Sequence, residues 1–512
     1  MTEAPDSQRE VLAFLADPAS HGGKEVRRIE THAASVFLAG DRALKVKRAV
    51  RFPFLDYSTL DKRRLACQAE LAVNAPYAPD IYRGIVPITR EADSKLAIGG
   101  SGTAVEWAVE MRRFDETRTL DHLGGEIDEV LAHALGRAVA AAHAKAPRVE
   151  AQAWIAALGS YIDEHVEAFR QHPSIFPAAE IEALARASRT AYERIVPLLR
   201  ERGRRGFVRR IHGDLHLGNI VLIDGKPVLF DAIEFSDLIA SGDVFYDLAF
   251  LLMDLLERGF APVANVVLNR YLADTRRIED LDALATLPFF LSLRAAIRAK
   301  VTAARMERAP AAERAAIART ARAYFAFASR AIAPQPPKFV AVGGLSGTGK
   351  TKLARDLAPE VEPMPGAVIV RSDVERKALF GVGETEKLPA DAYTDDITAR
   401  IYAVLADKAR RILATGHSVI VDAVFAQPQE RAAIAAAAKS ANSVLRGLFL
   451  TADLATRLRR VGARAGDASD ADQSVARAQE RFDLGPLDWT AVDASGPPEA
   501  TLSQAKAMLA AP

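Results

Sequence analysis

Two short motifs between His212 and Phe235 together contain two aspartates and one asparagine. The stretch HGDLHLGN, residues 212–219, contains Asp214 and Asn219, and LFDAIEF, residues 229–235, places Asp231 at the end of the strand-like segment PVLF. Transfer of a phosphoryl group from ATP needs a carboxylate that receives the proton of the acceptor hydroxyl, and oxygen ligands for Mg²⁺. We therefore predict Asp214 as the catalytic base or orienting group, and Asn219 and Asp231 as magnesium ligands.

A second phosphate-handling motif occurs much later, in GLSGTGKT, residues 344–351. It matches the pattern GxxxxGK[ST] and lies between a strand-like segment, FVAVGG, and a helix-like one, KTKLARDLA. In such a loop the backbone N–H groups surround a polyphosphate, the lysine reaches the β- and γ-phosphates, and the Ser/Thr hydroxyl binds Mg²⁺. The predicted nucleotide-binding residues are Gly344, Ser346, Gly347, Thr348, Gly349, Lys350 and Thr351. A glycine-rich turn without a ligand is the alternative.

Further polar residues follow the next strand-like segments. Asp422 follows the strand-like segment SVIV, residues 418–421, and is a candidate magnesium ligand together with Thr351. The alternative is that Asp422 only caps the end of the strand. RSDVERK, residues 371–377, lies where parallel sheets bind ligands, so Asp373 could accept a hydroxyl proton and Arg376 could hold an anion. Capping of the following helix is the alternative for Asp373.

A basic helix followed by a polar segment, RLRRVGARAGDASDAD, residues 457–472, is typical of a lid that closes over phosphates. One or two of its arginines could stabilise charge in the transition state, although each alone is more typical of a solvated surface. These arginines are Arg457, Arg460 and Arg464.

Two kinds of element must position these groups. Before the motif at 212–219 we predict a small sheet, with a hairpin turn at Ala39–Asp41 and a strand in 105–114, and then mostly helices, including 130–147 and 320–332. After the proline-rich segment APQPPK, residues 333–338, apolar strand-like and helical segments alternate, which predicts a parallel sheet covered on both faces. The predicted domains are 1–333 and 339–512, joined by a linker at 334–338.

Composition limits the class of protein. A chain of 512 residues with 49% hydrophobic and 26% charged residues fits two or three globular domains. A net charge of +1 gives no reason to expect a nucleic-acid or anionic-membrane partner, and the single Cys67 excludes a disulfide framework, so we expect a cytoplasmic location. The apolar run at 244–256 is too short to span a bilayer and contains Asp247 and Asp254, which predicts a buried helix.

The paired motifs at 212–219 and 229–235 resemble the catalytic loop and the metal-binding aspartate of the aminoglycoside phosphotransferase and choline kinase-like superfamily, in which Glu234 matches a frequent companion of the metal ligand. Residues 338–512 resemble small P-loop kinases of the gluconate kinase, shikimate kinase and zeta-toxin type. The order of all these pieces, with THAASVFLAGDRALKVKRAV, FLDYSTLDKRR and APDIYRGIVPI before them, resembles the bacterial bifunctional aminoglycoside phosphotransferase/ATP-binding protein family. The resemblance implies a bilobal α+β protein-kinase-like domain followed by an α/β P-loop kinase domain.

A protein-kinase-like fold also needs a lysine that positions the phosphates and a glutamate that holds the lysine. Lys45 and Lys47 point to the same face of a predicted strand, and we choose Lys45, with Glu70 as its partner. A solvated strand edge and helix face are the alternative. No GxGxxG precedes Lys45, and we expect adenine near residues 110–112.

The remaining question is the acceptor. Six arginines precede the catalytic loop: Arg200, Arg202, Arg204, Arg205, Arg209 and Arg210. They form either a solvated basic turn or a site for an anionic acceptor, while His216 is interpreted as structural. The leading interpretation is a two-domain Mg-ATP-dependent phosphotransferase that acts on hydroxyl groups of a small sugar-like or anionic metabolite. The presence of two sites suggests two successive phosphorylations of that metabolite. The alternatives are a nucleotide-gated regulatory or toxin-like protein with one half as an ATP sensor, and an ATP-binding scaffold with degenerate sites.

Overall fold

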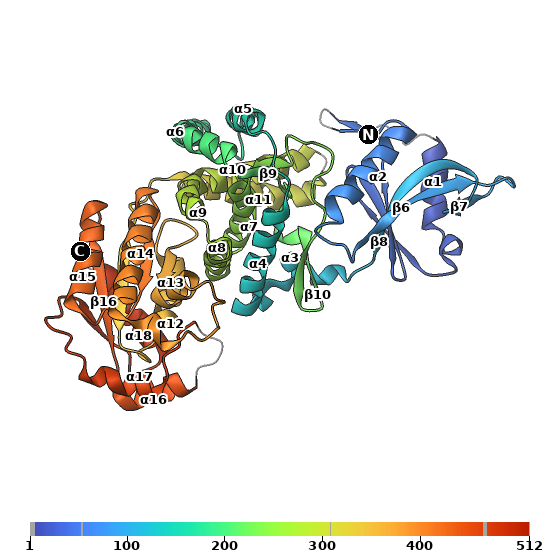
Figure 1. Cartoon of the computed structure of the whole chain (residues 1–512). Helices are drawn as coiled ribbons and strands as arrows, with labels where there is room; N and C mark the ends of the chain where they lie inside the picture. Colours follow the sequence, from blue (N-terminus) through green and yellow to red (C-terminus); the bar gives the residue numbers. More distant parts are fainter. Residues whose placement is uncertain (1–5, 53–54, 308, 464–467, 511–512) are drawn as a thin grey trace. The chain divides into compact units, whose positions relative to one another are not determined.

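A computed structural model describes residues 6–52, 55–307, 309–463 and 468–510 (Figure 1). Contacts between residues divide the chain into two compact units. One unit consists of residues 1–161 and 196–254, and the other of residues 162–195 and 255–512. The second unit therefore contains both the P-loop region and the helices that precede it. The helices α5 (Gln152–Arg170), α6 (Ala178–Arg204) and α7 (Val244–Glu257) each continue through a division point.

The first unit begins with an antiparallel sheet of six strands in the order β1-β2-β3-β8-β6-β7. These are β1 (Val26–Glu30), β2 (Ala34–Ala39), β3 (Arg42–Lys47), β6 (Tyr82–Arg90), β7 (Leu96–Ile98) and β8 (Thr103–Arg112). The predicted hairpin turn at Ala39–Asp41 is confirmed, because β2 pairs with β3 on either side of Gly40. The predicted strand within 105–114 is confirmed as β8.

Helices cover both faces of this sheet, and the side chains of β3 point alternately to one face and to the other. Leu44 and Val46 pack against α1 (Asp6–Ala16) in one apolar cluster. The other face packs against α2 (Leu60–Asn74), which contributes Cys67 to a second cluster. Because successive side chains of a strand point to opposite faces, Lys45 and Lys47 lie on the α2 face.

The segment with the predicted catalytic residues comes after the helices α3 (Leu120–Leu123), α4 (Glu129–Lys145), α5 and α6. It runs from β9 (Val208–Arg210) through the short 3₁₀ helix η4 (Leu217–Asn219) into the hairpin of β10 (Ile220–Ile223) and β11 (Lys226–Leu229). The strand β12 (Ser241–Asp243) then pairs with β9 and leads into α7. The buried helix predicted at 244–256 is confirmed as α7, and no described helix of the chain is long and apolar enough to cross a membrane.

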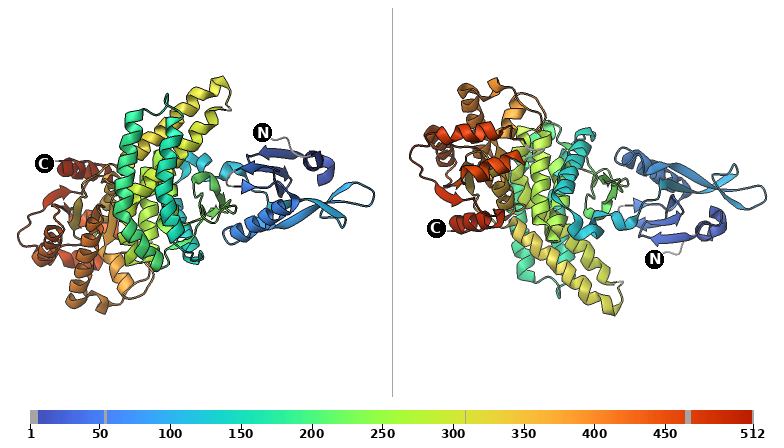
Figure 2. Two further views of the ribbon diagram at one scale, coloured as in Figure 1. Left: turned by 90° about the horizontal axis from the view of Figure 1, so that it is seen from above. Right: turned by 90° about the horizontal axis from the view of Figure 1, so that it is seen from below.

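The second unit contains a helical part and a sheet. Its helical part includes α8 (Ala261–Thr275), α9 (Ile278–Asp282), α10 (Leu287–Ala304) and α11 (Ala311–Ile332), of which α10 and α11 pack side by side (Figure 2). The sheet has five parallel strands in the order β14-β15-β13-β16-β17. They are β13 (Phe339–Gly344), β14 (Val368–Arg371), β15 (Val419–Asp422), β16 (Leu445–Thr451) and β17 (Thr490–Asp493).

Helices connect these strands and cover the sheet. One apolar cluster joins the strands to α12 (Lys350–Leu357) and α18 (Pro498–Ala510). The helices α13 (Ser372–Leu379), α14 (Asp395–Ala414), α15 (Pro428–Ser440), α16 (Leu454–Gly462) and α17 (Gln473–Ala478) complete the domain. The predicted fold class is thus confirmed for both parts of the chain, with the predicted parallel sheet formed by five strands.

The edge strand β14 is covered by α8. Asn269 accepts a hydrogen bond from the backbone N–H of Ile369 at 2.7 Å, and its amide donates to the carbonyl of Ala367 at 3.3 Å. Asn265 also donates to the carbonyl of Ala367, at 3.0 Å. These amides satisfy backbone groups that an edge strand otherwise exposes. The helix α8 is therefore part of the packing of the P-loop sheet.

Candidate active sites

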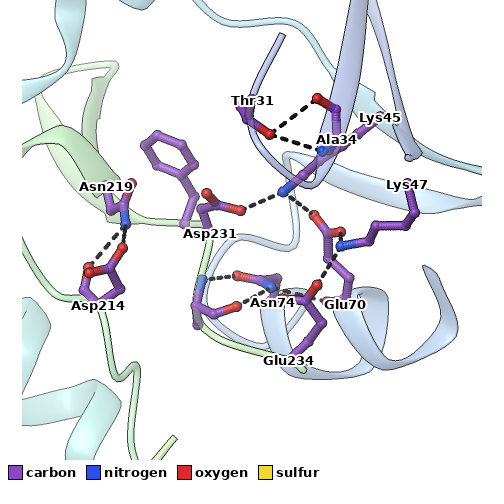
Figure 3. A network of polar contacts seen from close by, with 12 residues as sticks. Thr31, Ala34, Lys45, Lys47, Glu70, Asn74, Asp214, Asn219, Asp231 and Glu234 are labelled. Carbon is purple, nitrogen blue, oxygen red and sulfur yellow. Dashed lines mark hydrogen bonds and ion pairs between the residues drawn. The ribbon is translucent and has the colours of Figure 1, made fainter. Parts of the chain in front are cut away.

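The first site lies in the first unit and is organised around the ammonium group of Lys45 (Figure 3). Lys45 Nζ lies 2.8 Å from a carboxylate oxygen of Glu70 and 2.6 Å from Asp231. Burial disfavours the charged ammonium, but the two carboxylates outweigh burial and hold the pKa of Lys45 well above its ordinary value. The structure thus brings together the lysine, the glutamate and the acidic residue that the sequence proposed as one group.

The second lysine of β3 extends this network. Lys47 Nζ lies 2.5 Å from the other carboxylate oxygen of Glu70 and also pairs with Glu234, which accepts a hydrogen bond from the Tyr57 hydroxyl at 3.0 Å. The Glu70 side chain is 0% exposed, and the ammonium groups of the two lysines balance its buried charge. The sequence predicted that Lys47 lies on this face of the strand, but its ion pair with Glu234 could be seen only in the structure.

The predicted catalytic loop is held by the side chain of Asn219 and by hydrogen bonds that its backbone N–H groups donate to buried acids. Asn219 donates from its side-chain amide to the backbone oxygen of Asp214 at 3.0 Å and to its carboxylate at 3.1 Å. Asp247 accepts from the backbone N–H groups of His212 and Gly213, both at 3.0 Å. Asp254 accepts from the backbone N–H of Leu217 at 2.9 Å. The two acids that interrupt the apolar helix α7 therefore fix the loop that carries Asp214, a role that the sequence alone did not indicate.

The backbone at Asp231 is unusual for its residue type. Its φ is 61°, in the left-handed region, where non-glycine residues are uncommon. Asn74 fixes the next residue by accepting from the N–H of Ala232 at 2.7 Å and donating to its carbonyl at 3.1 Å. This support from α2 aims the Asp231 carboxylate, 44% exposed, at the cleft.

A cleft of about 660 Å³ connects these groups to an apolar end. The side chains of Val36, Leu38 and Met111 line the apolar end, and the turn between β1 and β2, at Thr31, occupies the place of a glycine-rich loop. Thr31 closes this turn by accepting from the N–H of Ala34 at 2.9 Å. Residues 111–114 line the cleft, whereas Glu110 pairs with Arg42 at 3.0 Å. Adenine contact at Glu110 to Arg112 therefore stays a prediction, with 111–114 as the part of the chain that faces the cleft.

The six arginines before the catalytic loop are placed outside the lining of this cleft. Arg202 is buried and pairs with Asp243 through two hydrogen bonds of 2.7 and 2.9 Å. Arg209 donates to three carbonyls at the end of α4, at 2.9–3.0 Å, and Arg210 pairs with Asp237. Arg204 pairs with Glu201, and Arg200 and Arg205 are exposed. His216 accepts from the N–H of Gly218 at 3.1 Å, which fits its structural interpretation.

The second site lies at the carboxyl edge of the parallel sheet. The loop Gly344–Thr351 joins β13 to α12, and Gly347 and Gly349 have φ of 87° and 95°. Glycine is needed at Gly347 for a second reason, because a Cβ there would lie 2.6 Å from the backbone oxygen of Arg457. Lys350 donates to the carbonyl of Leu345 at 3.2 Å, at the mouth of the same loop.

Three polar residues converge beside this loop. Thr351 donates from its hydroxyl to Asp422 at 2.6 Å, and strand pairing sets Arg371 beside Asp422. The Arg371 guanidinium lies 3.2 Å from the Thr351 hydroxyl and 3.4 Å from Asp422. Asp373 follows on α13, where burial raises the pKa of its carboxyl and the nearby Asp422 adds to the effect, against the pull of Arg371. Arg371 is the residue of this group that the sequence did not single out.

Arg376 points away from this group. It is buried and donates to the carbonyl of Ala392 at 2.6 Å and to the hydroxyl of Thr398 at 3.3 Å, with its guanidinium 4.8 Å from the centre of the Tyr393 ring. It therefore anchors the segment between α13 and α14, and its predicted contact with an anion stays a prediction.

The predicted lid arginines are held by backbone groups. Arg457 is buried and donates to the carbonyl of Ser346 at 2.9 Å. Arg460 donates to the carbonyls of Thr348 at 3.4 Å, Ala494 at 2.7 Å and Gly496 at 2.9 Å. Arg464 lies outside the described residues. In this structure the two described arginines contact the P-loop from its carbonyl side.

The donor sets of both sites fit Mg²⁺. Magnesium prefers oxygen ligands and commonly binds through one or two protein groups together with substrate phosphates. Asn219 and Asp231 would supply an amide and a carboxylate oxygen in the first site, and Thr351 and Asp422 a hydroxyl and a carboxylate in the second. Among the described residues no cluster of three or more His, Cys, Asp or Glu side chains could hold a metal ion.

Comparison with known proteins assigns both parts of the chain. A family model described as "Phosphotransferase enzyme family" matches residues 96–285, and one described as "AAA domain" matches residues 339–484. Curated proteins from Mycobacterium tuberculosis and Mycobacterium bovis, each named an uncharacterized protein, are 30% identical over 492 residues, which cover 93% of this chain and 94% of theirs. The chain belongs to the same family. The aligned residues cover most of both parts of this chain, and the resemblance inferred from the motifs is confirmed.

Solved structures match the two parts separately. A gluconokinase from Sinorhizobium meliloti is 22% identical, covers 34% of this chain and 92% of its own, and gives a TM-score of 0.26. A choline/ethanolamine kinase family protein from Mesorhizobium loti is 15% identical, covers 64% of this chain and 99% of its own, with a TM-score of 0.38. The two domain assignments identify a phosphotransferase enzyme and support ATP-dependent phosphoryl transfer.

Proposed function

We propose that both sites bind Mg-ATP and that each transfers the γ-phosphate to a hydroxyl group of a small metabolite. The observation that carries this proposal is that each unit brings together its own set of phosphoryl-transfer groups. In the first unit Lys45, Asp214 and Asp231 line one cleft. In the second, Thr351 and Asp422 are in contact beside the P-loop. A scaffold with degenerate sites would not be expected to keep both sets.

The roles within the first site follow from its charges. Lys45 would position the nucleotide phosphates, because its ammonium group lies beside Asp231, the proposed ligand of the magnesium ion. Asp231 and Asn219 would hold Mg²⁺. Asp214, whose side chain is 40% exposed, would receive the proton of the acceptor hydroxyl. A base must be reachable by the acceptor, and this exposure supports the assignment.

In the second site Asp373 is the proposed base. Its carboxyl lies among charged groups of both signs, Arg371, Asp422 and Lys350, all of which influence its pKa. A raised pKa makes a carboxylate a better proton acceptor once it is ionised. Arg371 would balance the charge of Asp422 and Asp373 before the nucleotide binds.

The acceptor is proposed to be a small polyhydroxyl compound. An anionic acceptor for the first site gains no support from the six arginines, because they lie outside the cleft lining and several are occupied by carboxylates or carbonyls. We further propose that the two units phosphorylate one metabolite in succession, since this gives a reason for carrying both sites on one chain. We also propose that residues 334–338 link the two domains predicted from the sequence, 1–333 and 339–512.

The test is ³¹P NMR of the full chain with Mg-ATP and the low-molecular-weight fraction of a bacterial extract. Wild type is compared with Asp214→Ala and Lys350→Ala, and with Arg205→Ala, an exposed control outside both sites. We expect new phosphoester signals in wild type and control, with each active-site variant stopping at a different product. Equal signals in all four proteins, or none in any, would refute the proposal and direct the search to a protein acceptor.

A further inference from the structure

Both backbone polar groups of the P-loop residue Ser346 are held by side chains from α16 and from the 3₁₀ helix Gln479–Arg481 that follows α17. Arg457, on α16, donates from Nε to the carbonyl of Ser346 at 2.9 Å. Gln479, which follows α17, accepts at Oε1 from the N–H of Ser346 at 2.7 Å. Arg457 also donates from Nη2 to this Oε1 at 3.2 Å. Ser346 is thus clamped on its donor side and on its acceptor side at once.

The clamp is buried and firmly anchored. Arg457 is 1% exposed and Gln479 is 6% exposed. All three nitrogens of the Arg457 guanidinium are engaged, because Nη2 also donates to the carbonyl of Ala476 at 3.1 Å and Nη1 pairs with Glu480. Such a side chain is committed to the protein and would have to break several hydrogen bonds to reach a phosphate.

The packing of α16 reinforces this arrangement. Its backbone approaches the loop so closely at Gly347 that a Cβ would meet the oxygen of Arg457 at 2.6 Å. One helical turn later Arg460 donates to the carbonyl of Thr348 at 3.4 Å. The carbonyls of residues 346 and 348 are therefore both turned toward arginines of α16.

This orientation matters for phosphate binding. A P-loop binds phosphates with converging backbone N–H groups, and carbonyls that turned inward would repel the anion. The clamp engages the N–H of Ser346 with Gln479, so it leaves phosphate binding to the other N–H groups of the loop, and it holds the carbonyls of residues 346 and 348 toward α16. Fixing this orientation before the nucleotide arrives removes an ordering cost that binding would otherwise carry. We propose that Arg457 and Gln479 are positioning residues, which set the orientation of the P-loop through Ser346 and thereby its affinity for nucleotide. The inference rests on the proposed nucleotide binding by this loop.

A positioning role and a direct role for Arg457 make different predictions. An arginine that stabilises charge only in the transition state changes kcat and leaves the affinity for ADP unchanged. An arginine and a glutamine that orient the loop change the affinity for ADP and ATP together. They also change the mobility of the loop without any nucleotide present.

The experiment uses the full chain with four substitutions. Gln479→Met keeps the size of the side chain but removes the acceptor, and Arg457→Lys keeps the charge but loses the forked contact. Arg459→Lys is the matched control, because Arg459 is an exposed neighbour on the same helix. Binding of a fluorescent ADP analogue is titrated, and the component lost in Lys350→Ala is assigned to the P-loop. Amide hydrogen exchange of the peptide covering residues 344–351 is measured without nucleotide.

We expect Gln479→Met and Arg457→Lys to weaken the P-loop component about tenfold and to speed exchange in 344–351, while β13 and the control stay as in wild type. Wild-type ADP affinity and exchange in both variants would overturn the inference, whether or not turnover falls. If Lys350→Ala removes no binding component, the proposed nucleotide binding by the loop fails instead, and the exchange data still decide whether the clamp orders the loop.

Discussion

Replacing Glu70 by Gln removes the shared negative charge between Lys45 and Lys47 while keeping the shape of the side chain. Glu70 is 0% exposed, and its two oxygens lie 2.8 and 2.5 Å from the two ammonium groups. Breaking a buried ion pair from one side typically costs about 3–5 kcal/mol, because the remaining charge stays buried without compensation. Here Lys45 keeps Asp231 and Lys47 keeps Glu234, so we expect the lower end, about 3 kcal/mol.

Hydrogen exchange resolves this loss in the first unit. The free energy of opening is measured from peptides of β3 and α2, which carry the network, and from peptides of the parallel sheet as an internal reference. Glu126→Gln is the control, since Glu126 pairs with Arg118 at 3.5 Å and both side chains are exposed. A change in the β3 and α2 peptides no larger than that of the control would refute the reasoning.

A double substitution tests the cause. If the loss arises from an uncompensated ammonium, then removing Lys47 as well should recover part of it. We therefore expect Lys47→Met to be less costly in the Glu70→Gln background than in wild type. A purely additive result would mean that the two charges do not interact, although they are 2.5 Å apart.

Three further predictions follow from buried groups. Asp247→Asn should lower turnover at the first site by at least tenfold, because the N–H groups of His212 and Gly213 lose a charged acceptor. Steady-state kinetics measured on the product that Asp214→Ala fails to form would show this loss. An unchanged kcat would contradict the prediction. Activity of the second site should fall as pH is lowered through the raised pKa of Asp373, since the base must be ionised; a pH–rate profile with the same limb in Asp373→Asn would exclude this role. Burial lowers the pKa of His417 from 6.5 to about 4, so protonation favours the unfolded chain. The second unit should therefore keep its full stability above about pH 6.5 and lose about 3 kcal/mol of unfolding free energy as pH falls toward 4. Urea unfolding at several pH values should show a smaller loss in His417→Gln.

Much of the fold was predictable because local patterns and tertiary packing agree. The strands of the parallel sheet are short apolar runs separated by helical segments, which is the alternation that predicted this sheet. The hairpin at Gly40 has a φ of 58° that glycine adopts without strain, so the turn was visible in the sequence. The covering of β14 by Asn269 was not visible, since an asparagine inside a helix carries no local sign of a distant edge strand.

The candidate sites divide in the same way. Asp214, Asn219 and Lys350 belong to motifs whose residues are near each other in sequence, and their neighbourhoods follow from the local chain. Asp247 and Asp254 were read only as interruptions of an apolar helix. Their function depends on the catalytic loop packing against α7, and they are the buried acceptors for N–H groups 35 and 37 residues away.

Arginines were the hardest residues to interpret, for a physical reason. A guanidinium can pair with a carboxylate, cap carbonyls, stack on a ring or bind a phosphate, and only the folded environment selects among these. Arg202 stacks 4.3 Å from the centre of the Phe207 ring while pairing with Asp243, and Arg457 spends its donors on the P-loop and its neighbours. Both were visible in the sequence only as members of basic stretches.

The two sites are proposed to hold phosphate by different means, and this difference sets how each should respond to substitution. In the first unit the proposed phosphate contact is a side chain, Lys45, whose position depends on the charge of Glu70. In the second, the proposed contacts include backbone N–H groups beside Lys350, and the orientation of these groups depends on glycine at Gly347 and on the clamp around Ser346. The first site should therefore be sensitive to neutral replacements that preserve shape, and the second to replacements that add a Cβ or remove a distant hydrogen bond while leaving every charge in place.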